Sequence, residues 1–352
     1  MTKIVNAGYP IYIGTNLLHN STATLLAHIA GRQVLIVSNV TVAAYYLTAV
    51  EKLLTNYQCH NLLLPDGEAY KTLASFSLII DKLVELHFNR QCTLIALGGG
   101  VISDLTGFAA ACYQRGVNVI HIPTTLLAQI DASIGGKTAI NHSQGKNLIG
   151  AFYPPRCVII DINTLLTLPQ REFVAGIAEM IKHALIADAQ YFSDIQTHLS
   201  LLLARDTDTL LRLIQRSCEI KAKIVQTDER EQSGQRLLLN FGHTFAHAIE
   251  TATHYTELLH GEAVAIGMVM AAKLSLGLGY VKQEIVQEII NLLSATGLPT
   301  QLPTSINATQ VIELFQYDKK NSDLGLQFVL LSAIGQAILE KQVSLSQLEA
   351  VL

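Results

Sequence analysis

A change in hydrophobic pattern near the middle of the chain limits what this sequence can fold into. Up to about Asp161, short β-branched runs bounded by turn residues alternate with segments of helical period. Alternating strands and helices predict an α/β region with a parallel sheet. The four runs are VLIVS at 34–38, LIALGGG at 94–100, VIHIP at 119–123 and CVIID at 157–161.

Helical periods dominate the second half of the chain, which we therefore expect to form a mainly α-helical domain. We place the two domains at 1–165 and 166–352. The Pro154–Pro155 pair is one place for the chain to leave the first domain, and the boundary can lie about 10 to 25 residues later. The expected helices are 170–190, 207–227, 240–252, 261–277, 283–296 and 308–317, with one strand pair at 327–335 and 337–341.

The composition excludes several classes of protein. With 352 residues, 50% of them hydrophobic and 15% charged, the chain is too apolar for a disordered protein and long enough for two packed domains. The net charge of -4 shows no basic excess, so we expect small-molecule partners and no nucleic acid. No apolar run reaches the roughly 18 residues needed to cross a bilayer, and the N-terminus shows no signal-peptide pattern. We therefore expect a cytoplasmic protein without a membrane partner.

Three glycines, Gly98–Gly100, follow an apolar strand directly and precede the helical segment 101–116. Glycines let a phosphate approach the backbone and a helix start offers free N–H groups, so this arrangement predicts an anion site. The pattern is not GxGxxG, and alone it is equally typical of a tight strand-to-helix turn. Two segments favour the anion site. One is PDGEAYKT at 65–72, and the other is 123–150, which we expect to be a glycine-rich loop that contacts ligand or solvent.

Histidines and a carboxylate on three predicted helices indicate a metal site. His243 and His247 are spaced i and i+4, which can converge on one ion or substrate, although such pairs are more often surface or core residues. His260 begins a further apolar helix, and Glu179 lies in an otherwise apolar helix with Lys182 three residues later. One carboxylate and two imidazoles form the ligand set of a catalytic zinc ion with open positions. We therefore predict Glu179, His243 and His260 as ligands, Glu250 and Glu262 as residues that either support the ligands from behind or face solvent, and His183 as a packing residue.

Seven segments follow one another along the chain. They are GGGVISDLTGFAAACYQRG at 98–116, PTTLLAQIDASIGGKTAIN at 123–141, GKNLIGAFYPP at 145–155, EMIKHAL at 179–185, LLNFGHTFAHAIE at 238–250, LHGEAVAIGM at 259–268 and DKKN at 318–321. Each segment is modest alone, but in this order they resemble the 3-dehydroquinate synthase family of sugar phosphate cyclases over nearly the whole chain, and the seven together at family-like spacing are specific. The resemblance implies an N-terminal domain with a Rossmann-like NAD site, a C-terminal helical domain that binds metal and substrate, an active site in the cleft between them, and a homodimer.

The resemblance also implies roles for individual residues. It assigns Zn²⁺ or Co²⁺ to the same three ligands, Glu179, His243 and His260. It assigns NAD to Asp66, Gly67, Glu68, Ala69, Tyr70, Lys71, Gly99, Gly100, Val101, Ile102, Ser103, Asp104, Thr124, Thr125, Lys137, Lys146, Thr164, Leu165, Leu166 and Thr167. It assigns the substrate to Asp131, Lys137, Asn147, Lys182, Lys221, Arg236, Asn240, His247 and one or both of Lys319 and Lys320.

Arg115 is implied to reach the site of a neighbouring subunit. The helix that starts at the glycine turn has about 11 residues and is about 16 Å long, so it carries Arg115 away from its own cofactor phosphates. The alternative is a solvated arginine at a helix end, where it interacts with the helix dipole.

The implied activity is that of a phosphate-eliminating lyase of the shikimate pathway, which leads to chorismate and the aromatic amino acids. NAD oxidises a hydroxyl of 3-deoxy-D-arabino-heptulosonate 7-phosphate, phosphate leaves, the hydride returns, and the opened sugar closes by intramolecular aldol addition to 3-dehydroquinate. The metal holds two hydroxyls and His247 is the candidate proton relay. A sugar acid phosphate needs several cations in fixed places, and only 24 of the 352 residues are Lys or Arg, so a lysine inside an apolar helix is informative.

Three other functions stay open. Another sugar phosphate cyclase would share the metal and NAD residues and differ in its contacts to the substrate, because fold and cofactor do not determine substrate. A glycerol-dehydrogenase-like oxidoreductase shares the architecture and has no use for the set of lysines and Asn147. A non-catalytic NAD- or metal-binding protein would not need all three metal ligands.

Overall fold

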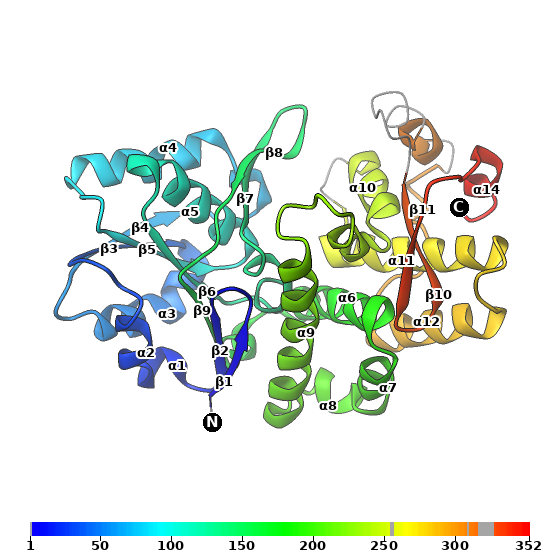
Figure 1. Cartoon of the computed structure of the whole chain (residues 1–352), viewed down its shortest axis with the longest axis horizontal. Helices are drawn as coiled ribbons and strands as arrows, with labels where there is room; N and C mark the ends of the chain where they lie inside the picture. Colours follow the sequence, from blue (N-terminus) through cyan, green and yellow to red (C-terminus); the bar gives the residue numbers. More distant parts are fainter. Residues whose placement is uncertain (1, 254–256, 308–309, 316–326) are drawn as a thin grey trace. The chain divides into compact units, whose positions relative to one another are not determined.

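A seven-stranded sheet forms the centre of the N-terminal half of the chain (Figure 1), in the order β1-β2-β9-β6-β5-β3-β4. All neighbouring strands are parallel except β1 and β2, which form an antiparallel hairpin at one edge. The computed structural model describes residues 2–253, 257–307, 310–315 and 327–352. The strands are β1 (Lys3–Asn6), β2 (Pro10–Gly14), β3 (Gln33–Asn39), β4 (Gln58–Leu64), β5 (Thr93–Gly98), β6 (Asn118–Pro123) and β9 (Cys157–Asp161).

The central strands are buried on both faces, which explains their continuous apolar runs. Every residue of β5 is buried, as expected for a parallel strand covered by helices on both sides. Alternate residues of β3 enter different cores: Leu35 packs with α4 (Leu73–Glu85) and α5 (Gly100–Cys112), whereas Ile36 packs with α1 (Leu17–Asn20) and α3 (Val40–Leu53). The parallel α/β region predicted from the sequence is confirmed.

Segment 123–150 differs from the prediction of a glycine-rich loop. It forms a five-residue π-helix, Ala128–Ala132, and then an antiparallel hairpin of β7 (Lys137–His142) and β8 (Gly145–Phe152). The loop prediction was wrong because three consecutive residues of β7, Thr138, Ala139 and Ile140, are buried although the segment is polar and glycine-rich overall, and Ile140 packs into the core of the unit. β4 and the β1–β2 hairpin were also not predicted.

The C-terminal half is mainly helical, as predicted, and is organised around α11 (His260–Gly277). Nearly every residue of α11 from Gly261 to Ser275 is buried, which is typical of a helix at the centre of a bundle. It packs against α6 (Gln170–Ala187), α10 (His243–Ala252), α12 (Gln283–Thr296) and strand β10 (Phe328–Ala333), which pairs with β11 (Gln336–Glu340). Further helices of this half are α7 (Ala189–Thr197), α8 (Leu199–Leu203), α9 (Thr207–Thr227) and α14 (Leu345–Glu349).

Two compact units divide the chain, and one of them is not continuous in sequence. Unit 1 comprises Met1–Leu168 and Lys221–Gln226, and unit 2 comprises Pro169–Ile220 and Thr227–Leu352. The chain therefore leaves unit 1 after Leu168 and contributes six residues of α9 to it later, a return that the sequence did not predict. Short helical segments complete the two units: α2 (Thr22–Leu26), η1 (Glu68–Tyr70), η2 (Tyr113–Arg115), η4 (Ile162–Thr167) and η5 (Arg236–Asn240).

The predicted helix 170–190 is two helices, because Asp188 ends α6 and caps α7 through its side chain. The predicted helix 308–317 lies partly outside the described residues, of which 310–315 are helical. None of the helices in the described ranges combines the length and the hydropathy needed to span a membrane.

Candidate functional site

In unit 1, the carboxyl ends of the parallel strands carry most of the residues predicted to bind a dinucleotide. The Gly98–Gly100 turn joins β5 to α5, and the N-cap residue of α5, Gly99, has no side chain to cap the first N–H groups of the helix. Thr124, at the end of the neighbouring strand β6, donates its N–H to the carbonyl of Gly98 (3.0 Å). Glycines at a helix start beside a strand end form the usual setting for a phosphate.

Lys71 is the centre of a hydrogen-bonded network in unit 1. Its side chain is 6% exposed, and its Nζ pairs with Asp104 and donates to Oδ1 of Asn147 (2.5 Å). The sequence assigned Lys71 and Asp104 to NAD and Asn147 to the substrate, and the structure brings all three together. Asn141 was missed: it bonds to Glu68 (2.7 Å), the carbonyl of Lys71 (2.8 Å) and the N–H of Asn147 (2.9 Å). Its only sequence signal was its place in the polar segment after Ile134.

Two further groups at this edge of the sheet were also missed. Asn39 is the last residue of β3, caps α3 by accepting from the N–H of Val42 (2.7 Å) and donates to Oδ1 of Asp66 (2.7 Å). Strand-end asparagines followed by a helical period are recognisable cap signals. Tyr46 contacts Thr167 and donates to the carbonyl of Thr164 (3.2 Å), which places a phenol among the predicted residues 164–167.

Asp131 and Lys221 come together within unit 1 although they are 90 residues apart in sequence. Lys221 is 7% exposed, pairs with the Asp131 carboxylate and donates to the Asp131 carbonyl (2.5 Å). Both had been predicted to contact substrate. Lys137 begins β7 and is exposed, and Lys146 lies in β8.

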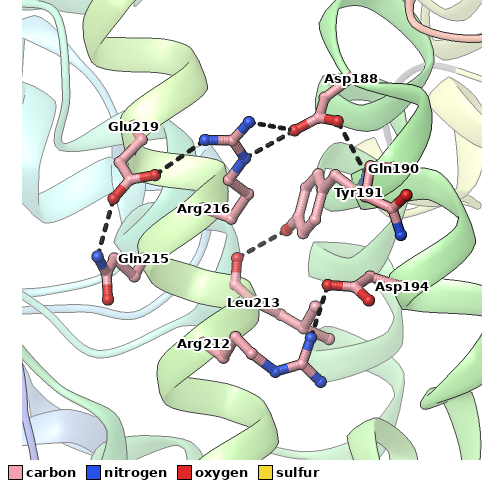
Figure 2. Close-up of a pocket in the computed structure, with 9 residues that line it drawn as sticks. All are labelled: Asp188, Gln190, Tyr191, Asp194, Arg212, Leu213, Gln215, Arg216 and Glu219. Atoms are coloured by element: carbon pink, nitrogen blue, oxygen red, sulfur yellow. Dashed lines mark hydrogen bonds and ion pairs between the residues drawn. The ribbon is translucent and has the colours of Figure 1, made fainter.

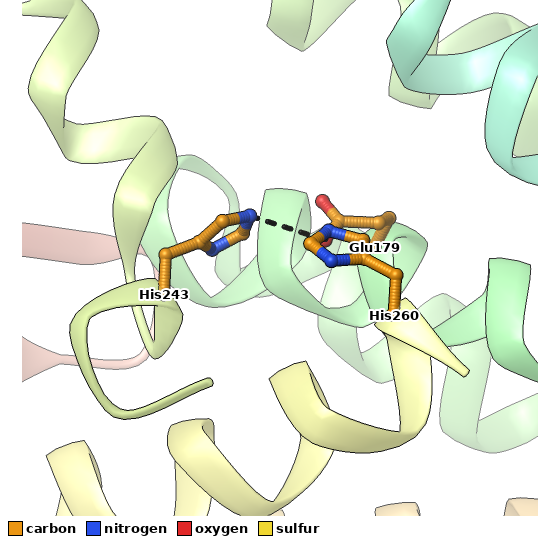
Figure 3. A group of neighbouring side chains, drawn as sticks. All are labelled: Glu179, His243 and His260. Atoms are coloured by element: carbon orange, nitrogen blue, oxygen red, sulfur yellow. Dashed lines mark ion pairs between the residues drawn. The ribbon is translucent and has the colours of Figure 1, made fainter. Parts of the chain in front are cut away.

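In unit 2, Glu179 of α6, His243 of α10 and His260 of α11 converge (Figure 3). Nε2 of His243 lies 3.6 Å and Nε2 of His260 lies 3.7 Å from the same oxygen, Oε1 of Glu179. One potential ligand atom from each residue lies within 4.8 Å of the other two. The three residues that the sequence had selected are therefore a group that can hold a metal ion.

Charge and burial make this group unusual. Glu179 is fully buried, and neither carboxylate oxygen accepts a hydrogen bond within the described parts of the chain, although Lys182 forms an ion pair with it. Lys182 is itself 1% exposed. Burial, together with the charge of Lys182, lowers the pKa of His243 well below its usual value, so this imidazole is neutral near pH 7. A neutral imidazole is the form that binds metals.

The other predicted residues of unit 2 have different environments. His247 is exposed, and its ring centre lies 5.7 Å from that of His243. Arg236 is buried and donates to the carbonyl of Glu229 (2.6 Å), and Asn240 ends η5. Asp228 was missed: it accepts from the N–H groups of Gln232 (2.7 Å), Ser233 (3.1 Å) and Arg236 (3.1 Å), and thereby organises the loop before Arg236.

The remaining predicted substrate residues are Arg115, Lys319 and Lys320. Lys319 and Lys320 lie outside the described residues. Arg115 is exposed at the end of η2 with φ of 68°, a left-handed conformation that it shares with the preceding Gln114 (φ 46°). Two successive non-glycine residues in this region are uncommon and store backbone strain.

A separate depression of about 330 Å³ lies between α7 and α9 (Figure 2) and contains none of the predicted site residues. Its walls carry charges of both signs, since Arg216 pairs with Asp188 and Glu219, and Arg212 pairs with Asp194. Tyr191 is buried beside it and donates to the carbonyl of Leu213 (2.7 Å). The three carboxylates outnumber the two guanidinium groups, so the depression offers no net positive charge to a phosphate or carboxylate.

Comparison with known proteins identifies relatives over the whole chain. Residues 61–175 match the family described as 3-dehydroquinate synthase N-terminal, and residues 176–321 match 3-dehydroquinate synthase C-terminal. A 3-dehydroquinate synthase from Coxiella burnetii (strain CbuG_Q212) is 52% identical over 99% of this chain and 97% of its own length.

Two solved structures have the same fold at lower identity. The 2-epi-5-epi-valiolone synthase of Streptomyces hygroscopicus subsp. jinggangensis, with NAD⁺ and Zn²⁺ bound, superposes with a TM-score of 0.90 at 28% identity, covering 100% of this chain and 97% of that one. A 2-deoxy-scyllo-inosose synthase complexed with carbaglucose-6-phosphate, NAD⁺ and Co²⁺ gives a TM-score of 0.88 at 28% identity, covering 100% and 99%.

Proposed function

The chain belongs to the 3-dehydroquinate synthase family, and on this premise we propose that it converts 3-deoxy-D-arabino-heptulosonate 7-phosphate into 3-dehydroquinate and phosphate. The observation that carries the proposal is the convergence of Glu179, His243 and His260 on one point in unit 2. The full-length relative at 52% identity supports this substrate over those of the two cyclases at 28% identity.

The three converging residues fit a divalent metal. The buried Glu179 carboxylate lacks hydrogen bonds within the described residues, and two imidazole nitrogens face one of its oxygens. One oxygen and two nitrogens suit Zn²⁺ or Co²⁺ with positions left for substrate. When bound, the metal polarises substrate oxygens as a Lewis acid.

Unit 1 fits NAD at the carboxyl edge of its sheet. The uncapped start of α5 suits the pyrophosphate, and Asp66 and Glu68 offer carboxylates to ribose hydroxyls. When bound, NAD supplies transient oxidation of one substrate hydroxyl and is restored within each turnover. Lys71 bridges Asp104 and Asn147, so it fixes the geometry of this edge before the cofactor arrives.

Cationic side chains and an imidazole of the chain bind the substrate and transfer protons. Lys182 and Arg236 are buried side chains of unit 2 that bind substrate anions by charge and hydrogen bonding. His247 is exposed beside the buried His243, so it can exchange protons with solvent and relay them to the substrate. In a homodimer, Arg115 of one subunit completes the phosphate pocket of the other.

One assay tests the proposal. The protein is incubated with NAD, Zn²⁺ or Co²⁺ and 3-deoxy-D-arabino-heptulosonate 7-phosphate, and phosphate, 3-dehydroquinate and NADH are followed. Equal release of phosphate and 3-dehydroquinate without net NADH is the expected result. Net NADH without phosphate indicates an oxidoreductase, and no product indicates a binding protein or a cyclase for a different sugar phosphate.

A further inference from the structure

We propose that Glu250 is a positioning residue that holds His260 in the ring orientation and tautomer in which Nε2 faces Glu179. The inference rests on the proposed metal site and adds a residue that binds neither the metal nor the substrate. Its observation is a continuous line of contacts through one imidazole. Oε1 of Glu250 lies 3.3 Å from Nδ1 of His260, and Nε2 of the same ring lies 3.7 Å from Oε1 of Glu179.

Burial shows that the Glu250 carboxylate has a specific place. Glu250 is 3% exposed, whereas the His260 side chain is 31% exposed. A buried carboxylate is unfavourable unless it is paired and hydrogen-bonded, and the imidazole of His260 is such a partner. The more exposed group of the pair is therefore the predicted ligand, and the buried group is its anchor.

A hydrogen-bond acceptor beside one imidazole nitrogen determines which nitrogen carries the proton. A neutral histidine carries one proton, and an acceptor at Nδ1 keeps the proton there. The lone pair of Nε2 then points at the metal position, and the charge of the carboxylate makes that lone pair more basic.

His243 shows the same arrangement with a different anchor. Its Nδ1 lies 3.3 Å from the main-chain carbonyl of Phe241, and a carbonyl can only accept, so the proton of His243 also sits on Nδ1. Both rings thus turn Nε2 toward the one oxygen of Glu179. The backbone orients the buried His243, and a side chain does the same for the half-buried His260.

The position of Glu250 follows from helix geometry. His243, His247 and Glu250 occupy positions i, i+4 and i+7 of α10, so they share one face of that helix. The same helix therefore contributes a ligand of its own and the anchor for a ligand on α11. This coupling fixes the spacing of two of the three predicted ligands.

Glu262 is closer to His260 in sequence and has a different task. Its carboxylate accepts two hydrogen bonds from Arg171 (both 2.7 Å) and one from the N–H of Leu259 (2.8 Å), which caps α11. Glu262 stabilises the start of the helix that carries His260, whereas Glu250 contacts the imidazole of His260. Glu262 is therefore a matched control, because it is a carboxylate at the start of α11, near His260, that makes its hydrogen bonds to Arg171 and Leu259 and not to the imidazole.

The experiment compares Glu250→Gln, Glu250→Ala and Glu262→Gln with the wild-type protein. The dissociation constants of Zn²⁺ and Co²⁺ are measured by competition with a chelator at fixed pH. Loss of such an outer contact typically weakens metal binding about 10- to 100-fold, so we expect this loss for Glu250→Ala. We expect a smaller loss for Glu250→Gln, which keeps an acceptor without the charge, and a change of less than about twofold for Glu262→Gln.

A second measurement does not depend on metal. Nitrogen-15 NMR of the histidine rings in the metal-free protein reports which nitrogen of His260 carries the proton. We expect the Nδ1–H form in the wild type and in Glu250→Gln, and a mixture of tautomers in Glu250→Ala. Since glutamine has the shape of glutamate, Glu250→Gln tests the charge even if the alanine variant does not fold.

The outcomes separate the two proposals. Wild-type metal affinity in both Glu250 variants, with His260 still in the Nδ1–H form, overturns the role of Glu250. Failure of the wild-type protein to bind either ion overturns the metal site, and the tautomer measurement then still decides whether Glu250 orients His260.

Discussion

The histidines of α10 and α11 differ in environment, and this difference distinguishes the two predicted ligands from the candidate proton relay. His243 and His260 face Glu179, whereas His247 is exposed on the same helix as His243. We expect His243→Ala or His260→Ala to lose bound metal and nearly all activity, because a site with three protein ligands rarely survives with two. His247→Ala should keep its metal and lose rate. Metal content by elemental analysis and kcat check both; a metal-free His247→Ala or stoichiometric metal in either other variant contradicts the assignment.

His121 on β6 makes stability depend on pH. It is 2% exposed, and burial lowers its pKa from 6.5 to about 4. Between about pH 6.5 and 4, His121 is therefore protonated in the unfolded chain and neutral in the folded chain. The free energy of unfolding is unaffected by His121 above about pH 6.5 and decreases as pH falls toward 4. A shift of this size corresponds to about 3 kcal/mol.

We therefore expect His121→Gln to lose less stability than the wild type between about pH 6.5 and 4, and denaturant titrations across this range measure the difference. His19→Gln is the control, since His19 is an exposed histidine of the same unit, and it should follow the wild type. Parallel pH profiles for His121→Gln and the wild type would show that His121 has no such role.

At the residue scale, the sequence selected side chains by their type and by their place on predicted helices. It brought Glu179, His243 and His260 together as candidates, and it left Glu250 open, because a contact between α10 and α11 depends on how two helices pack. Asn141 and Asp228 were missed because asparagine and aspartate are common in solvated loops, and only their backbone partners distinguish them.

At the scale of elements, the helices that carry the site approach one another so closely that only glycine fits. A Cβ at Gly261 of α11 would lie 1.9 Å from the carbonyl oxygen of Ala175 in α6, and one at Gly267 would lie 2.1 Å from the carbonyl oxygen of Gly242, just before α10. A backbone carbonyl cannot move away from an added Cβ as the end of a flexible side chain can. The approach therefore sets the distance between the helices that present the three predicted ligands.

We expect Gly261→Ala and Gly267→Ala to lower the thermal midpoint strongly and to weaken metal binding, because α11 must move away from α6 or α10. Gly277→Ala on the same helix is the control, since a Cβ there meets nothing within 4 Å. It should be neutral or stabilising by up to about 1 kcal/mol through helix propensity. Thermal unfolding monitored by circular dichroism gives the thermal midpoint of all three variants. A wild-type midpoint for Gly261→Ala would contradict the packing argument.

Elements with strong periodicity were predicted closely, and elements decided by tertiary contacts were not. The bounds of α9 and α12 agree with the predicted helices 207–227 and 283–296, because their apolar residues recur with a helical period over several turns. β4, QCHNLLL, lies at the edge of the sheet, where β3 is its one neighbour among the described strands. Polar residues are tolerated at an edge, and they hide the apolar pattern from which a strand is predicted. The β7–β8 hairpin depends on packing against α5, which local pattern does not contain.

At the scale of the whole molecule, Arg115 offers a test of the proposed homodimer. Gln114 donates to the carbonyl of Phe88 (3.0 Å) and Gly116 donates to that of Tyr113 (2.9 Å), so the left-handed backbone at Arg115 is held from both sides while its side chain is exposed. Strain maintained at an exposed cation is consistent with a functional contact.

We expect Arg115→Ala and Lys182→Ala each to be nearly inactive, and a mixture of the two to regain activity. A mixed dimer has one site that draws both residues from intact copies. With equal amounts and random exchange, about half of the dimers are mixed and each has one working site, so about a quarter of wild-type activity should return. Activity assays after verified subunit exchange measure this, and no recovery would show that Arg115 acts within its own chain or not at all.

The discontinuity of unit 1 has a consequence for protein synthesis. All seven strands of its sheet lie before residue 162, yet the unit also contains Lys221–Gln226, whose Lys221 pairs with Asp131. The two partners are 90 residues apart, and ribosomes add about 5 to 20 residues per second, so Lys221 is made roughly 5 to 18 s after Asp131. A nascent chain with its whole sheet outside the ribosome therefore still lacks a buried piece of its first unit. Completion of that unit has to wait until part of the second has been translated.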